Sequence, residues 1–215
     1  MAGKGDKDMK EVILMFDPGH GTREYTAGKR SPDSSLIEGE WNRDMVKRLI
    51  KACEEVGIKC VNIVPENEDI PRMVRVKRAN NIVTQNPAVE CYYISVHINA
   101  AKNDSKWHNA TGFTVWVSKG ASEKSIELAK NIYETAAEDF GLSGNRSVPA
   151  EKVWRANYDV IYHTKCPAIL TENLFMDNIV ECEFLKSERG KEIICNYHLV
   201  GIMKTLGLPY SLIIG

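Results

Sequence analysis

Two short apolar runs that each lead into a histidine constrain the fold of this chain most strongly. Residues 12–16 are followed by Asp17-Pro18-Gly19-His20, and residues 91–96 lead into His97. Runs of this length and composition are typical of strands buried on both faces of a parallel sheet. Ligands of open α/β sheets bind beyond the carboxyl ends of the strands, so we expect both imidazoles at one rim, within reach of a single metal ion.

Helical and extended segments alternate along the rest of the chain. Apolar residues spaced three to four apart indicate helices over residues 40–56, 70–83, 121–140 and 193–206. Short apolar runs indicate further strands over residues 58–64, 113–117 and 167–172. This alternation predicts an α/β fold with a mostly parallel twisted sheet flanked by helices. No repeat or long linker divides it, so we expect one domain over residues 10–215.

The charge and composition of the chain exclude several classes of partner. Its 28 basic and 29 acidic side chains are spread along the sequence, so no basic patch for nucleic acid is expected. No stretch has the roughly 18 apolar residues that a membrane span requires, so no membrane insertion is expected. The six cysteines stand apart in mostly apolar segments and predict free thiols. We expect a monomer.

The amino-terminal residues 1–9 form a polar leader without the apolar core of a secretory signal. We therefore expect a protein made for the cytoplasm, where thiols stay reduced. An exported protein whose signal peptide is missing from this sequence is the alternative interpretation.

Two carboxylates join the histidines at the expected rim of the sheet. Glu172 ends the strand predicted over residues 167–172, and Glu38 stands just before the first long helix. Two neutral imidazoles and one carboxylate are a ligand set for a catalytic zinc, which keeps its fourth position open for water. The remaining carboxylate would be free for acid–base chemistry. One Zn²⁺ is therefore the expected cofactor.

Five segments, taken in order, resemble the zinc-dependent N-acetylmuramoyl-L-alanine amidases. They are Asp17-Pro18-Gly19-His20-Gly21, Glu38 with Asn42, Arg75 with Ala79-Asn80, Ser95-Val96-His97-Ile98-Asn99-Ala100, and Pro167-Ala168-Ile169-Leu170-Thr171-Glu172. Members of this family hydrolyse the amide between N-acetylmuramic acid and the L-alanine of the stem peptide in bacterial cell walls. The resemblance covers most of the chain and implies a peptidoglycan or muropeptide substrate.

Residue by residue, the resemblance implies that His20, Glu38 and His97 bind zinc and that Glu172 is the catalytic carboxylate. Glu172 would take the proton of the zinc-bound water and return it to the leaving amine. Glu40 is a second candidate ligand in the same segment. We favour Glu38 because Asn42 then follows four residues later, as in the family.

The sequence departs from the family pattern directly after the catalytic strand. Asn173-Leu174 stands before Phe175, where relatives more often have a small polar residue and glycine. This departure predicts a different pocket shape near Glu172.

Several other residues carry less specific signals. Trp154 and Arg155 lie in a loop-bound stretch and are the predicted substrate contacts, because indole and guanidinium groups can stack on a sugar or bind a carboxylate. Asp17 either shapes its turn or orients a ligand imidazole. Arg75 and Asn80 are expected to tie a loop or a strand end through hydrogen bonds.

Two other functions stay open from the sequence. A zinc peptidase or amidase acting on another peptide would use the same residues, and a non-catalytic peptidoglycan-binding module would keep the fold without turnover. Within the amidase family, a chain without signal peptide or wall-binding modules is typical of a phage endolysin. An exported autolysin or remodelling enzyme is the alternative there.

Overall fold

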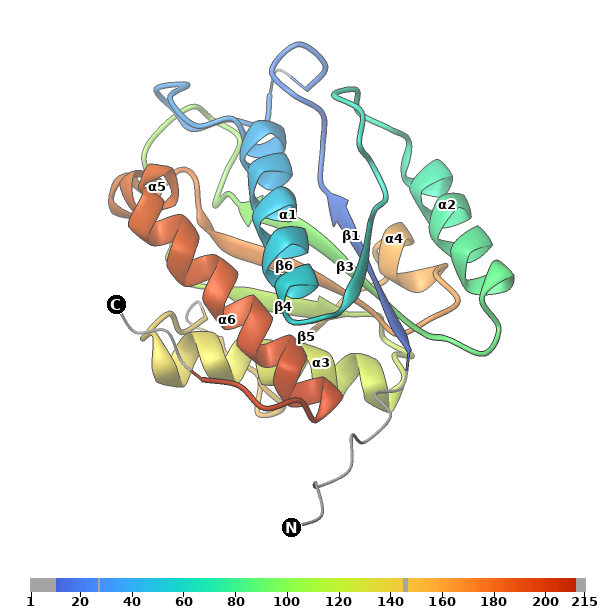
Figure 1. The fold of residues 1–215 in the computed structure, drawn as a ribbon. Helices are drawn as coiled ribbons and strands as arrows, with labels where there is room; N and C mark the ends of the chain where they lie inside the picture. The colour runs from blue at the N-terminus through green and yellow to red at the C-terminus, as the bar shows by residue number, and fades with distance from the viewer. Residues whose placement is uncertain (1–10, 27, 145–146, 212–215) are drawn as a thin grey trace.

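A six-stranded sheet forms the centre of the computed structural model, which describes residues 11–26, 28–144 and 147–211 (Figure 1). The strand order is β2-β1-β3-β6-β4-β5. The strands are β1 Val12–Pro18, β2 Lys59–Asn62, β3 Glu90–Asn99, β4 Thr114–Val117, β5 Trp154–Arg155 and β6 Ala168–Phe175. β2, β1, β3 and β6 run parallel, whereas β4 is antiparallel to β6 and pairs with β5 at the edge. The mostly parallel α/β sheet expected from the sequence is confirmed.

The four expected helical segments form helices. They are α1 Glu38–Glu55, α2 Arg72–Gln85, α3 Glu123–Glu134 and α6 Glu188–Leu206, and α3 continues into the π-helical turn η1 Thr135–Asp139. Ser122 and Ser187 begin α3 and α6 by accepting hydrogen bonds from backbone N–H groups of the first turn. Two helices that the sequence analysis does not predict are α4 Asp159–Tyr162 and α5 Ile179–Lys186, which are too short to show a clear helical period.

Two apolar layers cover the sheet because successive side chains of a strand point to opposite faces. One face of β1 and β3 packs against α1, α3 and α6, and the other packs against α2 and α4. The buried β1 and β3 residues of the first layer are Leu14, Phe16, Tyr92, Ile94, Val96 and Ile98, and those of the second are Ile13, Met15, Cys91 and Tyr93. Figure 1 shows the long helices α1 and α6 lying across the first face.

The register of the three central strands brings their carboxyl ends to one rim. Pro18 of β1 lies beside Val96 of β3, and His97 lies beside Glu172 of β6. The sheet therefore delivers the residues that follow β1, the end of β3 and Glu172 to a common edge, as the sequence predicts.

Three further expectations from the sequence are a polar leader, the absence of a membrane-spanning helix, and free cysteines. The polar leader expected at residues 1–9 lies outside the described residues. In the part that is described, no helix combines the length and apolarity needed to cross a bilayer. All six cysteines are free thiols.

Candidate metal centre and catalytic site

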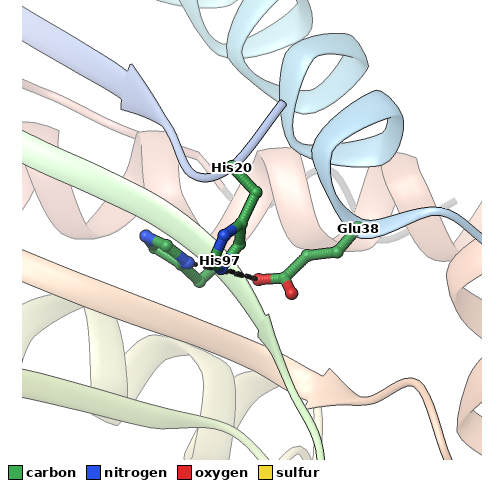
Figure 2. Close-up of side chains that lie close together, drawn as sticks. All are labelled: His20, Glu38 and His97. Carbon is green, nitrogen blue, oxygen red and sulfur yellow. Dashed lines mark hydrogen bonds and ion pairs between the residues drawn. The ribbon is translucent and has the colours of Figure 1, made fainter. Parts of the chain in front are cut away.

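His20, Glu38 and His97 converge beyond the carboxyl ends of β1 and β3 (Figure 2). His97 Nδ1 lies 3.1 Å and His20 Nε2 lies 3.5 Å from the same oxygen, Glu38 Oε1. One donor atom from each residue lies within 4.8 Å of the other two. The two imidazole rings stand perpendicular, with their centroids 5.1 Å apart. Three side chains that are distant in the sequence thus present two nitrogens and an oxygen to one point.

Two glycines allow the backbone to come this close. A Cβ at Gly19 would stand 2.1 Å from the His97 ring, and one at Gly39 would stand 1.7 Å from the Gly21 carbonyl oxygen. Gly19 therefore lets β1 pass against the imidazole, and Gly39 lets α1 begin against the loop that carries His20. His20 itself has φ 59°, in the left-handed region that non-glycine residues rarely adopt. Such a conformation persists only where surrounding contacts hold it.

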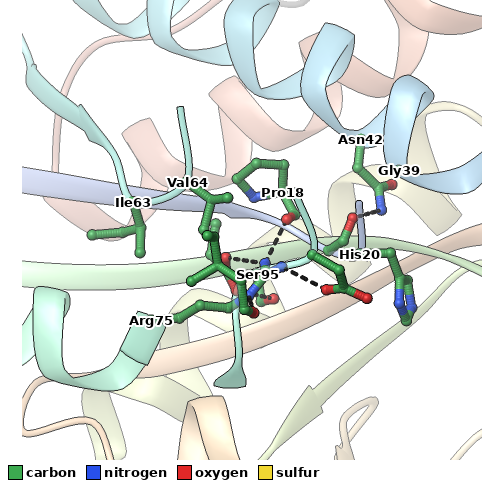
Figure 3. Close-up of polar contacts among 12 residues, drawn as sticks. Pro18, His20, Gly39, Asn42, Ile63, Val64, Arg75 and Ser95 are labelled. Atoms are coloured by element: carbon green, nitrogen blue, oxygen red, sulfur yellow. Dashed lines mark hydrogen bonds and ion pairs between the residues drawn. The ribbon is translucent and has the colours of Figure 1, made fainter. Parts of the chain in front are cut away.

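Side chains of α1 supply those contacts (Figure 3). Arg43 donates to the His20 carbonyl oxygen at 2.7 Å and to the Gly39 carbonyl oxygen at 2.9 Å. Asn42 donates through Nδ2 to the Gly19 carbonyl oxygen at 3.0 Å. The four-residue spacing between Glu38 and Asn42 puts both side chains on one face of α1. The first turns of α1 therefore carry the carboxylate of Glu38 and also the side chains of Asn42 and Arg43, which fix the backbone of Gly19 and His20.

Asp17 and Arg75 form a buried ion pair beneath this loop. Arg75 Nη1 lies 2.7 Å from Asp17 Oδ1 and also donates to the Pro18 carbonyl oxygen at 2.6 Å (Figure 3). The hydroxyls of Tyr93 and Ser95 donate to Asp17 Oδ2 at 2.6 and 2.9 Å. The hydrogen bonds of Asp17 therefore support the turn rather than an imidazole, and the tying role expected for Arg75 is confirmed. Asn80 does the same elsewhere, since its amide bonds the backbone of residues 163 and 165.

Glu172 lies directly beside His97 on the neighbouring strand. Its Oε2 atom is shielded from solvent and has no hydrogen-bond partner among the described residues. Burial raises the pKa of Glu172 to about 7, with the charge of His97 opposing the shift and that of Glu38 adding to it. A buried carboxyl without a fixed partner is available for proton transfer.

Burial and the ion pairs set the protonation of the other three groups. Burial lowers the pKa of His20 to about 4, so this imidazole is neutral at physiological pH. Burial would also lower the pKa of His97, but the hydrogen bond to Glu38 and nearby carboxylates raise it overall. Burial alone would raise the pKa of Glu38, and the contacts with His97 and His20 lower it overall. The contact between Glu38 and His97 therefore favours the charged form of both groups.

Glu40, the alternative ligand, points away from this cluster. Its side chain is exposed and accepts a hydrogen bond from the Arg23 backbone at 3.2 Å, whereas Glu38 is only 2% exposed. The structure therefore brings Glu38 and not Glu40 to the histidines.

A polar network lies behind the catalytic strand, at the place where the sequence departs from the family. Asn173 donates to the His97 carbonyl oxygen at 2.8 Å and accepts from the Tyr197 hydroxyl at 2.7 Å. Leu174 is 1% exposed and packs in the core. The departure is thus accommodated behind the strand, because neither side chain lines the cavity that holds Glu172.

A cavity of about 570 Å³ opens in front of the cluster and is lined by His20, His97 and Glu172. Lys29, Asp69, Arg72 and Tyr158 also line it. The sequence alone does not indicate a role for these four residues, because they lie in loops or at the start of α2 and belong to no motif or periodic pattern.

The two predicted substrate contacts lie away from this cavity. Trp154 is 8% exposed and packs against Tyr133, with ring centroids 5.4 Å apart. Arg155 pairs with Glu151 at 2.7 Å. Neither residue lines the cavity, so the structure does not bring them together with the four site residues.

An α/β sheet with a His₂Glu cluster and a further carboxylate at its rim has the groups that metal-dependent hydrolases use to hold a metal and to transfer a proton. A family model described as N-acetylmuramoyl-L-alanine amidase matches residues 14–204. The chain belongs to this family, which places it among the peptidoglycan amidases.

Individual relatives agree with the family match. The N-acetylmuramoyl-L-alanine amidase CwlM of Bacillus licheniformis is 23% identical over 199 residues, covering 92% of this chain and 70% of the relative. The endolysin of Bacillus phage SPP1 is 25% identical over 201 residues, covering 91% of this chain and 66% of the relative. The chain thus spans about two thirds of the length of these curated relatives.

Solved structures share the fold. The crystal structure of an N-acetylmuramoyl-L-alanine amidase from Clostridium difficile 630 superposes with a TM-score of 0.78 at 24% identity, covering 92% of this chain and 98% of that one. The amidase Ami1 from Mycobacterium smegmatis superposes with a TM-score of 0.76 at 18% identity, covering 94% and 99%.

Proposed function

We propose that His20, Glu38 and His97 bind one Zn²⁺ and that Glu172 transfers the proton in hydrolysis of the amide between N-acetylmuramic acid and L-alanine. The observation that carries this proposal is the convergence of two imidazole nitrogens on one oxygen of a buried carboxylate, with an unpartnered carboxyl beside them. The family match supports the reaction.

The donor set fits zinc in chemistry and in spacing. Ligand atoms at a tetrahedral zinc with bonds of about 2.1 Å stand about 3.4 Å apart. The separations of 3.1 and 3.5 Å from Glu38 Oε1 to the two imidazole nitrogens match that spacing. Because a buried carboxylate needs a compensating positive charge, a divalent cation held beside Glu38 would supply that charge.

Zinc held by these residues would supply Lewis-acid activation of water and polarisation of the scissile carbonyl. The residues of the chain supply the rest. Arg43 and Asn42 hold the His20 loop, and the Arg75–Asp17 pair fixes the turn before it, so the ligands keep their geometry without reorganisation.

Glu172 carries the proton between the two halves of the reaction. It accepts a proton from water as the water oxygen attacks the carbonyl carbon, and it returns that proton to the nitrogen of L-alanine as the C–N bond breaks. A carboxyl whose pKa is raised to about 7 can do both near neutral pH. The products are the free lactyl carboxylate of the sugar and a peptide with a free amino terminus.

The setting of this activity follows from the relatives. One is a bacterial wall amidase by name and another is a phage endolysin. We propose that the substrate is the peptidoglycan of a bacterial cell wall.

A matched pair of variants tests the ligand set. Glu38→Ala and Glu40→Ala remove carboxylates two residues apart, one inside the cluster and one exposed. We expect the parent and Glu40→Ala to hold about one zinc per chain by elemental mass spectrometry, and Glu38→Ala to lose most of it. The parent should release the stem peptide with a free L-alanine amino terminus from a defined muropeptide.

Two results would contradict the proposal. If Glu38→Ala keeps its zinc while Glu40→Ala loses it, the choice of ligand fails. If the zinc-loaded parent leaves the muropeptide intact or cuts a bond within the peptide, the proposed reaction fails.

A further inference from the structure

A second cavity, of about 310 Å³, adjoins the catalytic one and shares Lys29 with it. Its walls are the loop between β1 and α1 and the loop between β3 and β4, and Met176 and Asp177 between β6 and α5 also line it. Its most prominent polar residues are the cations Lys29, Arg30, Lys102 and Lys106. We call this cavity the basic pocket.

The cations of the basic pocket are unpaired. In the described ranges, no carboxylate lies within 4.0 Å of any of the four side-chain charges. Cations elsewhere in the described chain do have carboxylate partners, among them Arg48, Arg78, Lys152 and Lys186. Four cationic residues therefore line one cavity, and none of them forms an ion pair with a described carboxylate within 4.0 Å.

The one acidic residue that lines the basic pocket, Asp177, forms hydrogen bonds with backbone N–H groups. Asp177 is 4% exposed, and its two oxygens accept hydrogen bonds from the backbone N–H groups of Ala101 and Lys102 at 2.9 to 3.1 Å. It holds the loop that carries Lys102 and Lys106 rather than neutralising their side chains. The pocket therefore keeps a strong preference for an anion.

Both walls are fastened to the catalytic cluster. The Glu38 backbone N–H donates to the Lys29 carbonyl oxygen at 3.0 Å. Ala101 lies two residues after the end of β3, which carries His97, and Asp177 lies two residues after the end of β6, which carries Glu172. An anion bound in the basic pocket would thus sit at a fixed position beside the reacting amide.

The two sides of the scissile amide differ in charge. On one side, the sugar of N-acetylmuramic acid is neutral, because its lactyl carboxyl group is consumed in the amide. On the other side, the stem peptide carries free carboxylates from its second residue onward. Since an extended residue spans at most about 3.6 Å, the first of these lies on the order of 7 Å from the bond that breaks.

We propose that the basic pocket binds carboxylates of the stem peptide, so that the leaving peptide extends over the loops of Lys29 and Lys102. This proposal rests on the proposed function. It orients the substrate, because the neutral sugar then lies in the catalytic cavity on the side of Tyr158 and Pro71. Lys29, Lys102 and Lys106 become determinants of specificity for an acidic stem.

Paired substrates and paired variants test this inference. The substrates are a muropeptide with free stem carboxyls and the same muropeptide with those carboxyls amidated. We expect Lys102→Met combined with Lys106→Met to raise KM for the free acid about fivefold or more, because each exposed charge pair contributes up to about 1 kcal/mol. The kcat should stay within about twofold, and KM for the amidated substrate should not change.

Two control variants separate charge from structure. Lys51 lies on the far part of α1 with an 80% exposed side chain, so Lys51→Met should leave KM unchanged for both substrates. Lys102→Arg combined with Lys106→Arg keeps both charges and should restore the parent KM. Unfolding midpoints should be equal for all variants, since the side chains replaced are exposed.

Other outcomes overturn the proposal in distinguishable ways. An unchanged KM for the free acid in the double methionine variant refutes it, as does an equal rise for both substrates. A loss seen only with intact walls and not with soluble muropeptides would assign the pocket to a phosphate polymer of the wall instead. If the zinc-loaded parent cleaves neither muropeptide, the proposed function itself has failed.

Discussion

At the level of single residues, the geometry of the His20–Glu38–His97 cluster depends on side chains that form hydrogen bonds with the backbone around His20. Arg43, Asn42 and Arg75 together bind the carbonyl oxygens of Pro18, Gly19 and His20. The left-handed conformation of His20 is maintained by these bonds. The sequence analysis leaves two roles open for Asp17, because an Asp before Pro carries no information on which donors surround it.

His198 is a fully buried histidine outside the site, and its titration gives a prediction about stability. Its Nδ1 donates to the Ile194 carbonyl oxygen at 2.8 Å, and burial lowers its pKa to about 4. Since the unfolded chain has a histidine pKa of about 6.5, unfolding takes up a proton below that pH. The free energy of unfolding is therefore highest above pH 6.5, where His198 is neutral in both states, and it decreases as the pH falls from 6.5 towards 4.

The variant His198→Gln isolates this effect. We expect the free energy of unfolding of the parent, from urea titrations, to fall more steeply between pH 6.5 and 4 than that of the variant, by roughly 3 kcal/mol over the interval. Equal pH dependence in the two proteins would contradict the prediction. A resonance of His198 that titrates near pH 6.5 would contradict it independently.

At the level of elements, β6 combines Glu172, the proposed catalytic carboxylate, with a bulge. His97 pairs with Glu172 and Asn99 pairs with Phe175, so two residues of β6 oppose the single residue Ile98 of β3. Leu174 occupies the bulge with φ 64°, a conformation that favours glycine. This gives a physical reason for the glycine that relatives more often have at this position.

Substitution of Leu174 separates strain from packing. Leu174→Ala should lower the free energy of unfolding by about 2 to 5 kcal/mol, because a buried side chain is lost. Leu174→Gly should be as stable as the alanine variant or more stable by up to about 1 kcal/mol, since glycine relieves the left-handed strain.

Ile169, a buried residue in the regular part of β6, provides the control. There Ile169→Gly should be less stable than Ile169→Ala by about 1 kcal/mol, because glycine adds only conformational entropy to the unfolded chain. The same order at Leu174 would contradict the assignment of strain to the bulge. Urea unfolding of the four variants measures both differences.

The elements themselves show how far the sequence determines the fold. The parallel core is predictable because β1, β3 and β6 each contain a buried, mostly apolar run that leads into a polar residue, namely Asp17, His97 and Glu172. α5 and the edge strand β5 are not, since eight and two residues are too few to establish a period. The burial of Trp154 depends on its packing with Tyr133, a contact between distant segments that local sequence does not encode.

At the level of the whole molecule, the candidate site consists of two adjoining cavities at one rim of the sheet. The order of motifs along the chain predicts His20, Glu38, His97 and Glu172 as neighbours because parallel strands must end together. Lys29, Lys102 and Lys106 share a cavity only because two loops meet, so their association is absent from sequence spacing. The proposed metal site and the basic pocket together would suit a substrate that is neutral on one side of the scissile amide and acidic on the other.

The central claim is that Glu172 carries the proton while His20, Glu38 and His97 hold the metal. The variant Glu172→Gln keeps the size of the side chain and removes its ability to accept a proton. We expect Glu172→Gln to bind as much zinc as the parent and to cleave a defined muropeptide with kcat lower by about 10² to 10⁴, measured by mass spectrometry of the released stem peptide. A zinc-loaded Glu172→Gln protein with the kcat of the parent would contradict the account.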